Sequence, residues 1–367
     1  MKNIILINAK IKREYKEWLE KAKGLSITTV DQMLRPIVLY ESIFNNEDFG
    51  HFRKQKALEF ISYLRMKQNG NKLSSNSIRT YLMHLKSFFE WLITQPGYKS
   101  KIHSSDLEYL RVSKKESRLA AQKTIRKYPS KQDIIDLVNS VEIKNDVDRR
   151  DQAIIAFSFL TGMRDSAIIS LRLNCIDIER LWVEQNPRFG VNTKGSKIIF
   201  SKIFKFDKDL FDVVIRWVNY LKKKGYTDVD PVFPRCKNEF IDDGYSFQES
   251  TEIEPCFWSS SNSIRKIFKE RSEKAHLPYF PPHAFRHSAV EYALGLARNG
   301  MEVKAISQNF GHEDVSTTIS VYANLPLDQL MNLLDDMELG KKSITLNEES
   351  IKMLTEMHKI VVTKKNG

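Results

Sequence analysis

The chain has 367 residues, of which 41% are hydrophobic and 28% charged, and it carries a net charge of +12. This length allows two domains with separate cores, and the composition is too apolar for a disordered chain. No stretch approaches the roughly 18 uninterrupted apolar residues of a membrane span, and Met1–Leu6 is too short for a signal peptide, so we expect a soluble cytoplasmic protein. Three cysteines, Cys175, Cys236 and Cys256, are far apart and odd in number. This predicts reduced structural thiols rather than a disulfide framework or a zinc knuckle.

The positive charge is concentrated in one segment of the chain. Between residues 51 and 127, 17 Lys and Arg stand against five Asp and Glu, and the remaining residues together are neutral. Each Lys or Arg that contacts a phosphate releases a condensed counterion, so such a segment is typical of a module that binds a polyanion. A solvated charged surface is the alternative, and charge alone does not separate the two.

Helical patterns dominate the first third of the chain. Residues 1–50 contain amphipathic stretches without recognisable site chemistry, and we assign them as an N-terminal helical extension. Apolar residues recur at helical spacing over 52–66. The cluster Leu73-Ser74-Ser75-Asn76 is a good N-cap for a second helix over 77–92, whose apolar residues form one face. These two helices predict a helical domain over 51–112.

The rest of the chain reads as a linker, a larger domain and a tail. Residues 113–127 are basic with few large apolar side chains, as in an exposed linker. A second domain is expected over 128–340 and a tail over 341–367. β-branched and aromatic residues predict a small β-hairpin or three-stranded sheet over 181–204. Helices are expected at 131–141, 151–160, 165–173, 210–222, 263–274, 284–297 and 303–310. The predicted fold is therefore mainly α with one small β-sheet.

Six polar residues, scattered over more than half of the chain, stand in short contexts that suit phosphodiester chemistry. They are Arg164 in Thr161-Gly162-Met163-Arg164, Lys194 in Thr193-Lys194-Gly195-Ser196-Lys197, His283 and Arg286 in His283-Ala284-Phe285-Arg286-His287, His312 after Gly311, and Tyr322 ten positions after His312. Breaking a phosphodiester requires a nucleophile, donors for the charge on the non-bridging oxygens, and an acid for the leaving oxygen. Arginine suits the second task because its planar guanidinium binds phosphate oxygens bidentately and stays protonated.

In this order and context the six residues resemble the active site of the tyrosine recombinase (phage integrase) family, over roughly residues 55–325. The resemblance implies a core-binding, SAM-like DNA-binding domain over 51–112 and a catalytic domain over 128–340, which together clamp double-stranded DNA. It implies that Tyr322 forms a 3′-phosphotyrosyl link without any cofactor or metal, in a homotetramer on two DNA sites associated with the nucleoid. Ala167 is a departure, because family members often carry an acidic residue there.

The two histidines on the expected helix allow a second interpretation. His283, Arg286 and His287 are at positions i, i+3 and i+4, and Pro281-Pro282 sets His283 near the helix N-terminus, which favours an anion. His283 and His287 also have the spacing of a zinc-binding helix. However, Ala284 replaces the glutamate of that motif, so its general base is missing. We expect His287 to pack internally, while the resemblance assigns function to His283 and Arg286.

The lysine assignment has alternatives as well. Lys194 lies at an expected hairpin tip, from which an ammonium group can reach the leaving 5′ oxygen and protonate it. The resemblance matches Lys194 to the catalytic lysine of the family. Lys197 and Lys202 remain possible substitutes, and an exposed lysine is often only solubilising.

Two other functions and one further surface stay open. A type IB topoisomerase uses a similar tyrosine site, although a small helical N-terminal domain argues against it. A non-catalytic integrase-like DNA-binding protein is the other alternative, and the presence of all six residues argues against it. The amphipathic segment 327–339 could pack on a neighbouring subunit or within its own chain.

Overall fold

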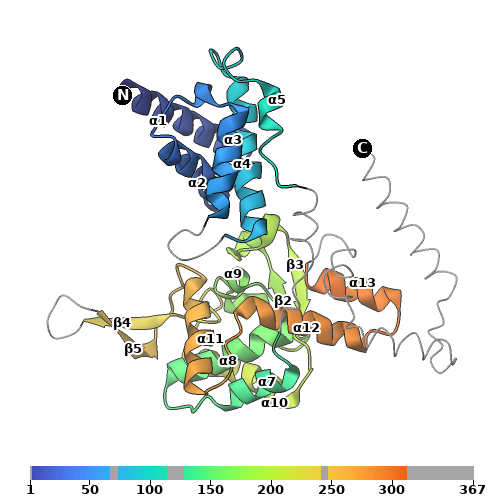
Figure 1. Ribbon diagram of the computed structural model, residues 1–367. Helices are drawn as coiled ribbons and strands as arrows, with labels where there is room; N and C mark the ends of the chain where they lie inside the picture. The colour runs from blue at the N-terminus through green and yellow to red at the C-terminus, as the bar shows by residue number, and fades with distance from the viewer. Residues whose placement is uncertain (1, 67–72, 114–127, 241–246, 312–367) are drawn as a thin grey trace, which may run out of the picture. The chain divides into compact units, whose positions relative to one another are not determined.

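The computed structural model describes most of the chain (Figure 1). The described ranges are 2–66, 73–113, 128–240 and 247–311. Two of the six predicted site residues, His312 and Tyr322, lie outside these ranges, as does the segment 327–339. Among the described helices, none is long and apolar enough to cross a membrane.

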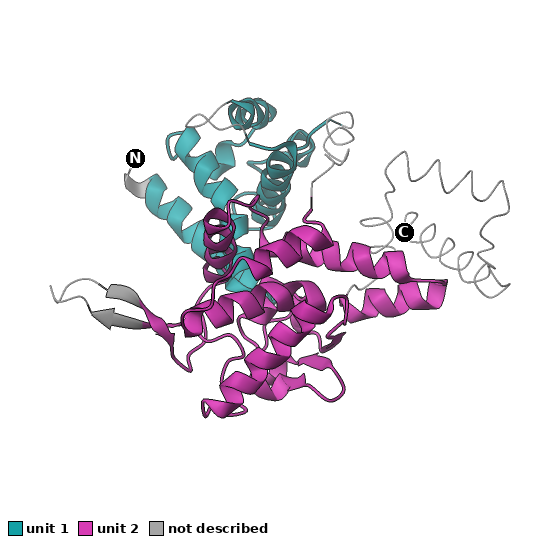
Figure 2. Cartoon of the chain, turned by 90° about the horizontal axis from the view of Figure 1, so that it is seen from below, with its two compact units in different colours: residues 1–126 teal, residues 127–367 magenta. Residues whose placement is uncertain are grey.

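The chain forms two compact units, Met1–Arg126 and Lys127–Gly367, which Figure 2 shows in different colours. The described part of the first unit is built from helices. They are α1 (Lys2–Glu17), α2 (Ile27–Ile43), α3 (Lys54–Arg65), α4 (Ser75–Ile93) and α5 (Ser104–Leu107). The predicted cap of α4 is confirmed, because the Ser74 hydroxyl accepts a hydrogen bond from the Ser77 N–H at 3.1 Å.

The core of the first unit is rich in aromatic rings. Tyr15 of α1 meets Phe88 of α4 edge to face with the ring centres 5.2 Å apart, and Tyr40 of α2 meets Phe89 at 5.4 Å. Both phenylalanines are fully buried, and truncating either to alanine would cost about 3–5 kcal/mol. A partly buried ion pair between Lys12 and Glu41 also joins α1 to α2. Residues 1–50 therefore share one core with α3 and α4.

The second unit combines helices with two small antiparallel sheets. Its helices are α7 (Lys131–Asn139), α8 (Asp146–Thr161), α9 (Asp165–Ile168), α10 (Lys208–Lys223), α11 (Asn262–Lys274), α12 (Pro282–Leu296) and α13 (Gly300–Asn309). One sheet has the order β1 (Ile176–Asp177), β2 (Trp182–Gln185), β3 (Ile199–Lys202), and the other pairs β4 (Cys236–Phe240) with β5 (Phe247–Ile253). The mainly helical fold and the sheet predicted at 181–204 are confirmed, whereas the β4–β5 hairpin was not predicted.

The helix expected over 165–173 was wrong in its length. α9 ends at Ile168, and the chain then pairs with a distant segment: the Val232 N–H donates to the Leu171 carbonyl at 2.9 Å, and the Leu173 N–H donates to the Asp230 carbonyl at 3.0 Å. These bonds satisfy backbone groups that a longer helix would have satisfied internally.

A buried ionic network surrounds the first half of α8. The Arg150 guanidinium, 2% exposed, donates to the Asp151 carboxylate at 2.7 Å. Arg271 of α11 donates to the other oxygen of Asp151 at 2.8 Å and to Asp148 at 2.7 Å. Burial raises the pKa of Asp148, but the hydrogen bonds from Arg271 and from the Lys144 N–H outweigh it, so the net pKa lies below the usual value. Because every buried charge has a partner, α8 can cross the core with charged residues in it.

Candidate active site

Arg286 ties three segments of the second unit together. It is 3% exposed, and its Nη1 donates to the Gly162 carbonyl and its Nη2 to the Phe310 carbonyl, each at 2.6 Å. The guanidinium also lies 5.6 Å from the centre of the Phe310 ring. A buried arginine requires such partners, because an uncompensated charge in a core is costly. The end of α8, the first half of α12 and the end of α13 are thus held at one point.

The Gly162 turn positions Arg164. Gly162 ends α8 with φ 56° and ψ 24°, a left-handed conformation that glycine adopts without strain. The half-buried Arg164 then takes the N-cap position of α9, two residues from the carbonyl that Arg286 binds. The neighbouring Asp165 accepts a hydrogen bond from Arg265 of α11 at 3.0 Å, which fixes the start of α9. The backbone of Arg164 and the guanidinium of Arg286 therefore both lie at the Gly162 turn.

Lys194 lies in the connection between β2 and β3, as predicted, and its side chain is exposed. The connection is attached to the α9 segment, because the Asn192 N–H donates to the Ser170 hydroxyl at 2.8 Å. Gly195 and Ser196 both have positive φ, 71° and 52°, which gives the tight turn at the tip. A hollow of about 280 Å³ opens between this connection and α9. Its lining is Ser166, Pro187, Gly190, Val191, Asn192, Thr193, Lys194 and Ser196.

The end of α13, which leads to His312, is fixed on strand β3. The Asn309 side chain accepts from the Lys202 N–H at 2.6 Å, and the Asn309 carbonyl accepts from the Ser201 hydroxyl at 2.8 Å. Gly311, with φ 64°, packs so closely on Ile199 that a Cβ would overlap it. The last described residue before His312 is thus held by the same sheet that carries the Lys194 connection.

His283 and His287 face each other one turn apart on α12. Their Nε2 atoms are 3.1 Å apart, and the rings are perpendicular with centres 4.7 Å apart. His283 is exposed, whereas His287 is half-buried and stacks on Tyr128, with ring centres 4.5 Å apart. His287 thus contacts both a neighbouring histidine and an aromatic ring.

Two contributors were absent from the predicted set of residues. Asn309 holds the backbone before His312, and Tyr128 holds His287. The sequence signal for Asn309 is weak, because it consists only of a polar residue placed directly before Phe310-Gly311. For Tyr128 there is none, since 159 positions separate it from His287.

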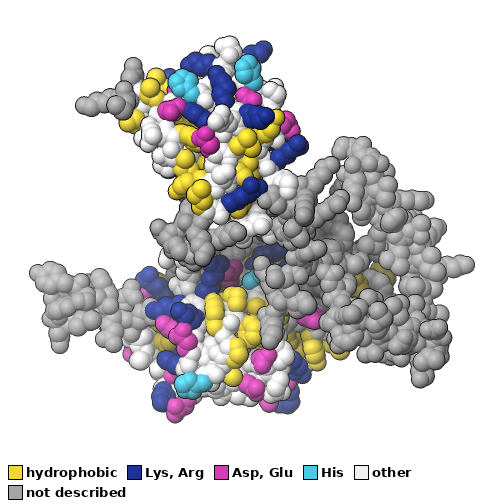
Figure 3. All heavy atoms as spheres, viewed as in Figure 1, with side chains coloured by type: hydrophobic (Ala, Val, Ile, Leu, Met, Phe, Trp, Pro, Cys, Tyr) yellow, Lys and Arg dark blue, Asp and Glu magenta, His cyan; other side chains and the backbone are white. Residues whose placement is uncertain are grey.

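The first unit carries the positive charge of the chain. Residues 1–126 hold 24 Lys and Arg against 12 Asp and Glu, and residues 127–367 hold 34 of each kind. Figure 3 shows Lys and Arg side chains over the visible face of the first unit, with Asp and Glu among them. Some of these cations already have partners: Lys86 pairs with Glu108 at 2.8 Å and Lys101 with Asp48 at 3.2 Å. The number of Lys and Arg side chains in residues 51–127 that stand without a carboxylate partner is therefore smaller than 17.

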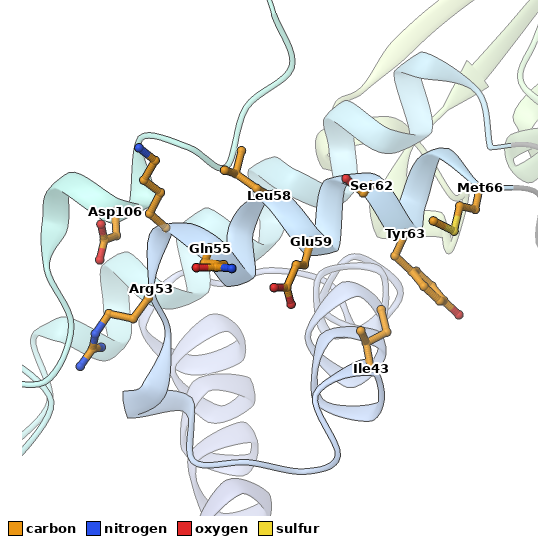
Figure 4. Close-up of a pocket in the computed structure, with 10 residues that line it drawn as sticks. Ile43, Arg53, Gln55, Leu58, Glu59, Ser62, Tyr63, Met66 and Asp106 are labelled. Atoms are coloured by element: carbon orange, nitrogen blue, oxygen red, sulfur yellow. The ribbon is translucent and has the colours of Figure 1, made fainter.

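A groove of about 910 Å³ lies along the outer face of α3 in the first unit (Figure 4). It contains none of the six predicted site residues, and its walls mix exposed apolar side chains with both signs of charge. The lining residues are Ile43, Arg53, Lys54, Gln55, Leu58, Glu59, Ser62, Tyr63, Met66 and Asp106. The negative carboxylates of Glu59 and Asp106 would repel a phosphate, so the groove does not resemble an anion-binding site.

Comparison with known proteins agrees with this geometry. The sequence model described as "Phage integrase family" matches residues 127–327. The tyrosine recombinase XerD of Staphylococcus saprophyticus subsp. saprophyticus is 24% identical over 332 residues, which cover 88% of this chain and 96% of that protein.

Two solved structures share the fold. The XerH site-specific recombinase bound to a palindromic difH substrate superposes with a TM-score of 0.58 at 15% identity, covering 89% of this chain and 85% of the other. The lambda integrase tetramer bound to a Holliday junction gives a TM-score of 0.56 at 13% identity, covering 84% and 76%. Since the family match spans more than half of the chain, this protein belongs to the phage integrase family of tyrosine recombinases.

Proposed function

We propose that this chain is a site-specific recombinase that cleaves and rejoins DNA strands through a 3′-phosphotyrosyl link to Tyr322. One observation supports the proposal most directly. Arg286 donates to the carbonyls of Gly162 and Phe310, and these residues stand two positions before Arg164 and His312. Motifs that are far apart in sequence therefore share one anchor, as a single catalytic centre requires.

The proposed chemistry balances without a cofactor or a metal. The Tyr322 oxygen forms a bond to the scissile phosphorus and passes its proton to solvent water, while the bond to the 5′ oxygen breaks and that oxygen gains a proton from Lys194. Arg164, Arg286, His283 and His312 donate hydrogen bonds to the non-bridging oxygens, where negative charge grows in the transition state. A phenol has a pKa of about 10, so these donors are needed to make phosphotyrosine formation accessible at neutral pH. A 5′ hydroxyl from a partner strand then reverses the step.

The first unit supplies the affinity for duplex DNA in this proposal. Its excess of cations is the expected source of counterion release. The two units clamp the duplex, and four copies act on two DNA sites in the cytoplasm, at the nucleoid. The lambda integrase tetramer on a Holliday junction, which has the same fold, supports the tetramer.

Covalent trapping tests the proposal. Duplexes that tile the DNA flanking the gene are nicked next to each candidate scissile phosphate, so that the short fragment with the new 5′ hydroxyl diffuses away after cleavage and the adduct accumulates. We expect a denaturation-resistant protein–DNA adduct with the wild type and none with Tyr322→Phe, which removes only the hydroxyl.

Trapping separates the non-catalytic alternative, and a plasmid assay separates the topoisomerase, whose similar tyrosine site would also form an adduct. Sequence-selective binding with no adduct on any duplex would identify a non-catalytic DNA-binding protein. Relaxation of a supercoiled plasmid without joining of two partner sites would identify a topoisomerase. An adduct that maps to another tyrosine would contradict the assignment of Tyr322.

The role of the first unit has its own test. The affinity of the full chain for duplex DNA should fall steeply with salt, with a log–log slope of about −0.9 for each phosphate neutralised. Deletion of residues 1–127 should weaken binding and flatten this slope. Equal affinity of both proteins at low and moderate salt would contradict the assignment.

A further inference from the structure

We propose that His287 is a positioning residue for His283, and that Tyr128 holds His287 in place. This inference rests on the proposed function, because the contact between His283 and the scissile phosphate is part of that proposal. It assigns a task to a histidine that the sequence pattern left as ordinary packing.

The two imidazoles contact each other through their ring nitrogens. Their Nε2 atoms are 3.1 Å apart, which is hydrogen-bond distance, and the perpendicular rings allow an in-plane N–H of one to point at the other. Such a bond needs a proton on one Nε2 and a lone pair on the other. The two facing nitrogens therefore share one proton, and each ring restricts the tautomer of the other.

The direction of this bond decides what His283 offers to a substrate. When the Nε2–H of His287 donates to the Nε2 of a neutral His283, the proton of His283 must be on Nδ1. When His283 is a cation, its Nε2–H donates to His287, and Nδ1 still carries a proton. We assign His287 as the donor to neutral His283, because the reverse neutral arrangement would leave Nδ1 of His283 without a proton. In the assigned neutral state and in the cation, His283 keeps an N–H donor at Nδ1, which is the group that an anionic phosphate oxygen requires.

His287 is itself anchored by the start of the second unit. Tyr128 stacks on its ring with an angle of 12° between the planes, which limits rotation of the imidazole. The next residue, Pro129, accepts a hydrogen bond from the buried Ser288 hydroxyl at 2.5 Å. The chain at the start of the second unit is thus fixed to α12 beside the histidine pair. Through His287, the orientation of His283 depends on this short segment.

Single-turnover cleavage of the nicked duplex at saturating DNA tests the inference in the full chain. His287→Phe keeps an aromatic ring for the stack but cannot hydrogen-bond, and we expect it to slow adduct formation about 10- to 100-fold, less than the full effect of an acid–base group. His287→Gln has an amide nitrogen near the position of Nε2 and should restore most of the rate. Tyr128→Leu should lower the rate in the same direction. Duplex affinity should stay unchanged in all three variants.

Two controls separate positioning from damage to the fold. Glu291→Gln changes an exposed residue on the same helix and should behave as the wild type. In a His283→Ala background, His287→Phe should cause no further loss, because the two substitutions remove one interaction. An unchanged rate for His287→Phe, an equal loss in the His283→Ala background, or failure of His287→Gln to recover would each overturn the inference.

A measurement without catalysis distinguishes this inference from the proposed function. The ¹⁵N chemical shifts of labelled histidine, with His283 assigned by comparison with His283→Ala, report which ring nitrogen carries the proton. We expect the Nδ1–H form of neutral His283 in the wild type and a mixture of tautomers in His287→Phe. A mixture already in the wild type would contradict the inference whether or not an adduct forms. Lack of an adduct in the wild type would contradict only the proposed function.

Discussion

The ring of Phe310 fills the space that a side chain at Gly162 would occupy. A Cβ at Gly162 would overlap two atoms of this ring and approach the Cβ of Ala289. The carbonyls of the same two residues accept the hydrogen bonds of Arg286. Close approach of the α8 turn to the end of α13 therefore allows one guanidinium to reach both.

Gly162→Ala should lower the free energy of unfolding by about 2–5 kcal/mol, the sum of about 1–2 for the left-handed backbone and about 1–3 for overpacking. Chemical denaturation measures this loss. Gly225→Ala is the matched control, because Gly225 also has positive φ but has no atom within 4 Å of the added Cβ. Equal losses for the two variants would mean that the backbone conformation alone, and not Phe310, requires glycine at position 162.

Arg286→Lys should lower the single-turnover cleavage rate about 100-fold or more, because the single nitrogen of lysine cannot reproduce the planar fork whose Nη1 and Nη2 bind the two carbonyls separately. Stability should fall as well, since the Gly162 and Phe310 carbonyls lose their donors. The rate is measured on the nicked duplex, beside Arg216→Lys, which alters an exposed arginine of α10. A wild-type rate for Arg286→Lys would remove Arg286 from the site.

Lys194→Ala should slow cleavage of ordinary DNA by about 100-fold, as expected for loss of a general acid. A duplex in which sulfur replaces the 5′ bridging oxygen should react at nearly the wild-type rate, because a thiolate leaves without protonation. Lys202→Ala is the comparison, since Lys202 is an alternative candidate whose ammonium lies 3.4 Å from the Arg180 carbonyl. Sulfur rescue of Lys202→Ala, and not of Lys194→Ala, would transfer the role of acid to Lys202.

The ionic network of α8 should make stability depend on acid pH. The pKa of Asp148 is lower in the folded than in the unfolded chain, because Arg271 and the Lys144 N–H outweigh the effect of burial. Its contribution is therefore complete above the unfolded value of about 3.9 and is lost as pH falls below it. Asp148→Asn should cost about 1.5–3 kcal/mol at pH 7, and its difference from the wild type should shrink toward pH 3.

Denaturant titrations at pH 7, 5, 4 and 3 measure this effect. Asp136→Asn, at an exposed position on α7, should remain within about 0.5 kcal/mol of the wild type throughout. A constant difference between Asp148→Asn and the wild type at all four pH values would contradict the assignment.

Much of the fold could be predicted because local signals were strong. Ser74 and Ser130 are N-caps with apolar faces behind them, and both helices begin at these residues. The start of α8 was missed by five residues, because the segment with Asp148 and Arg150 is polar in sequence although both side chains are buried as ion partners. Burial of paired charges depends on Arg271, which is more than 100 positions away.

The candidate site likewise combines features that the sequence predicts with features that only the fold determines. The residue types of the six predicted positions carry their chemistry in the sequence. The carbonyls of Gly162 and Phe310 do not, because every residue has a carbonyl and only the fold determines which one Arg286 reaches. The stack of Tyr128 on His287 is equally hidden, since it depends on how the start of the unit returns to α12.

The distribution of charge between the units has a consequence for how such proteins diverge. Residues 1–126 hold 24 cations against 12 acids, and residues 127–367 hold 34 of each. The proposed function therefore places attraction to a polyanion and bond chemistry in separate stretches of sequence. Exchanging surface lysines for acids in the first unit would retune residence time on DNA while leaving the cleavage step intact. Selection for affinity to DNA and selection for a working nucleophile can then proceed with little conflict.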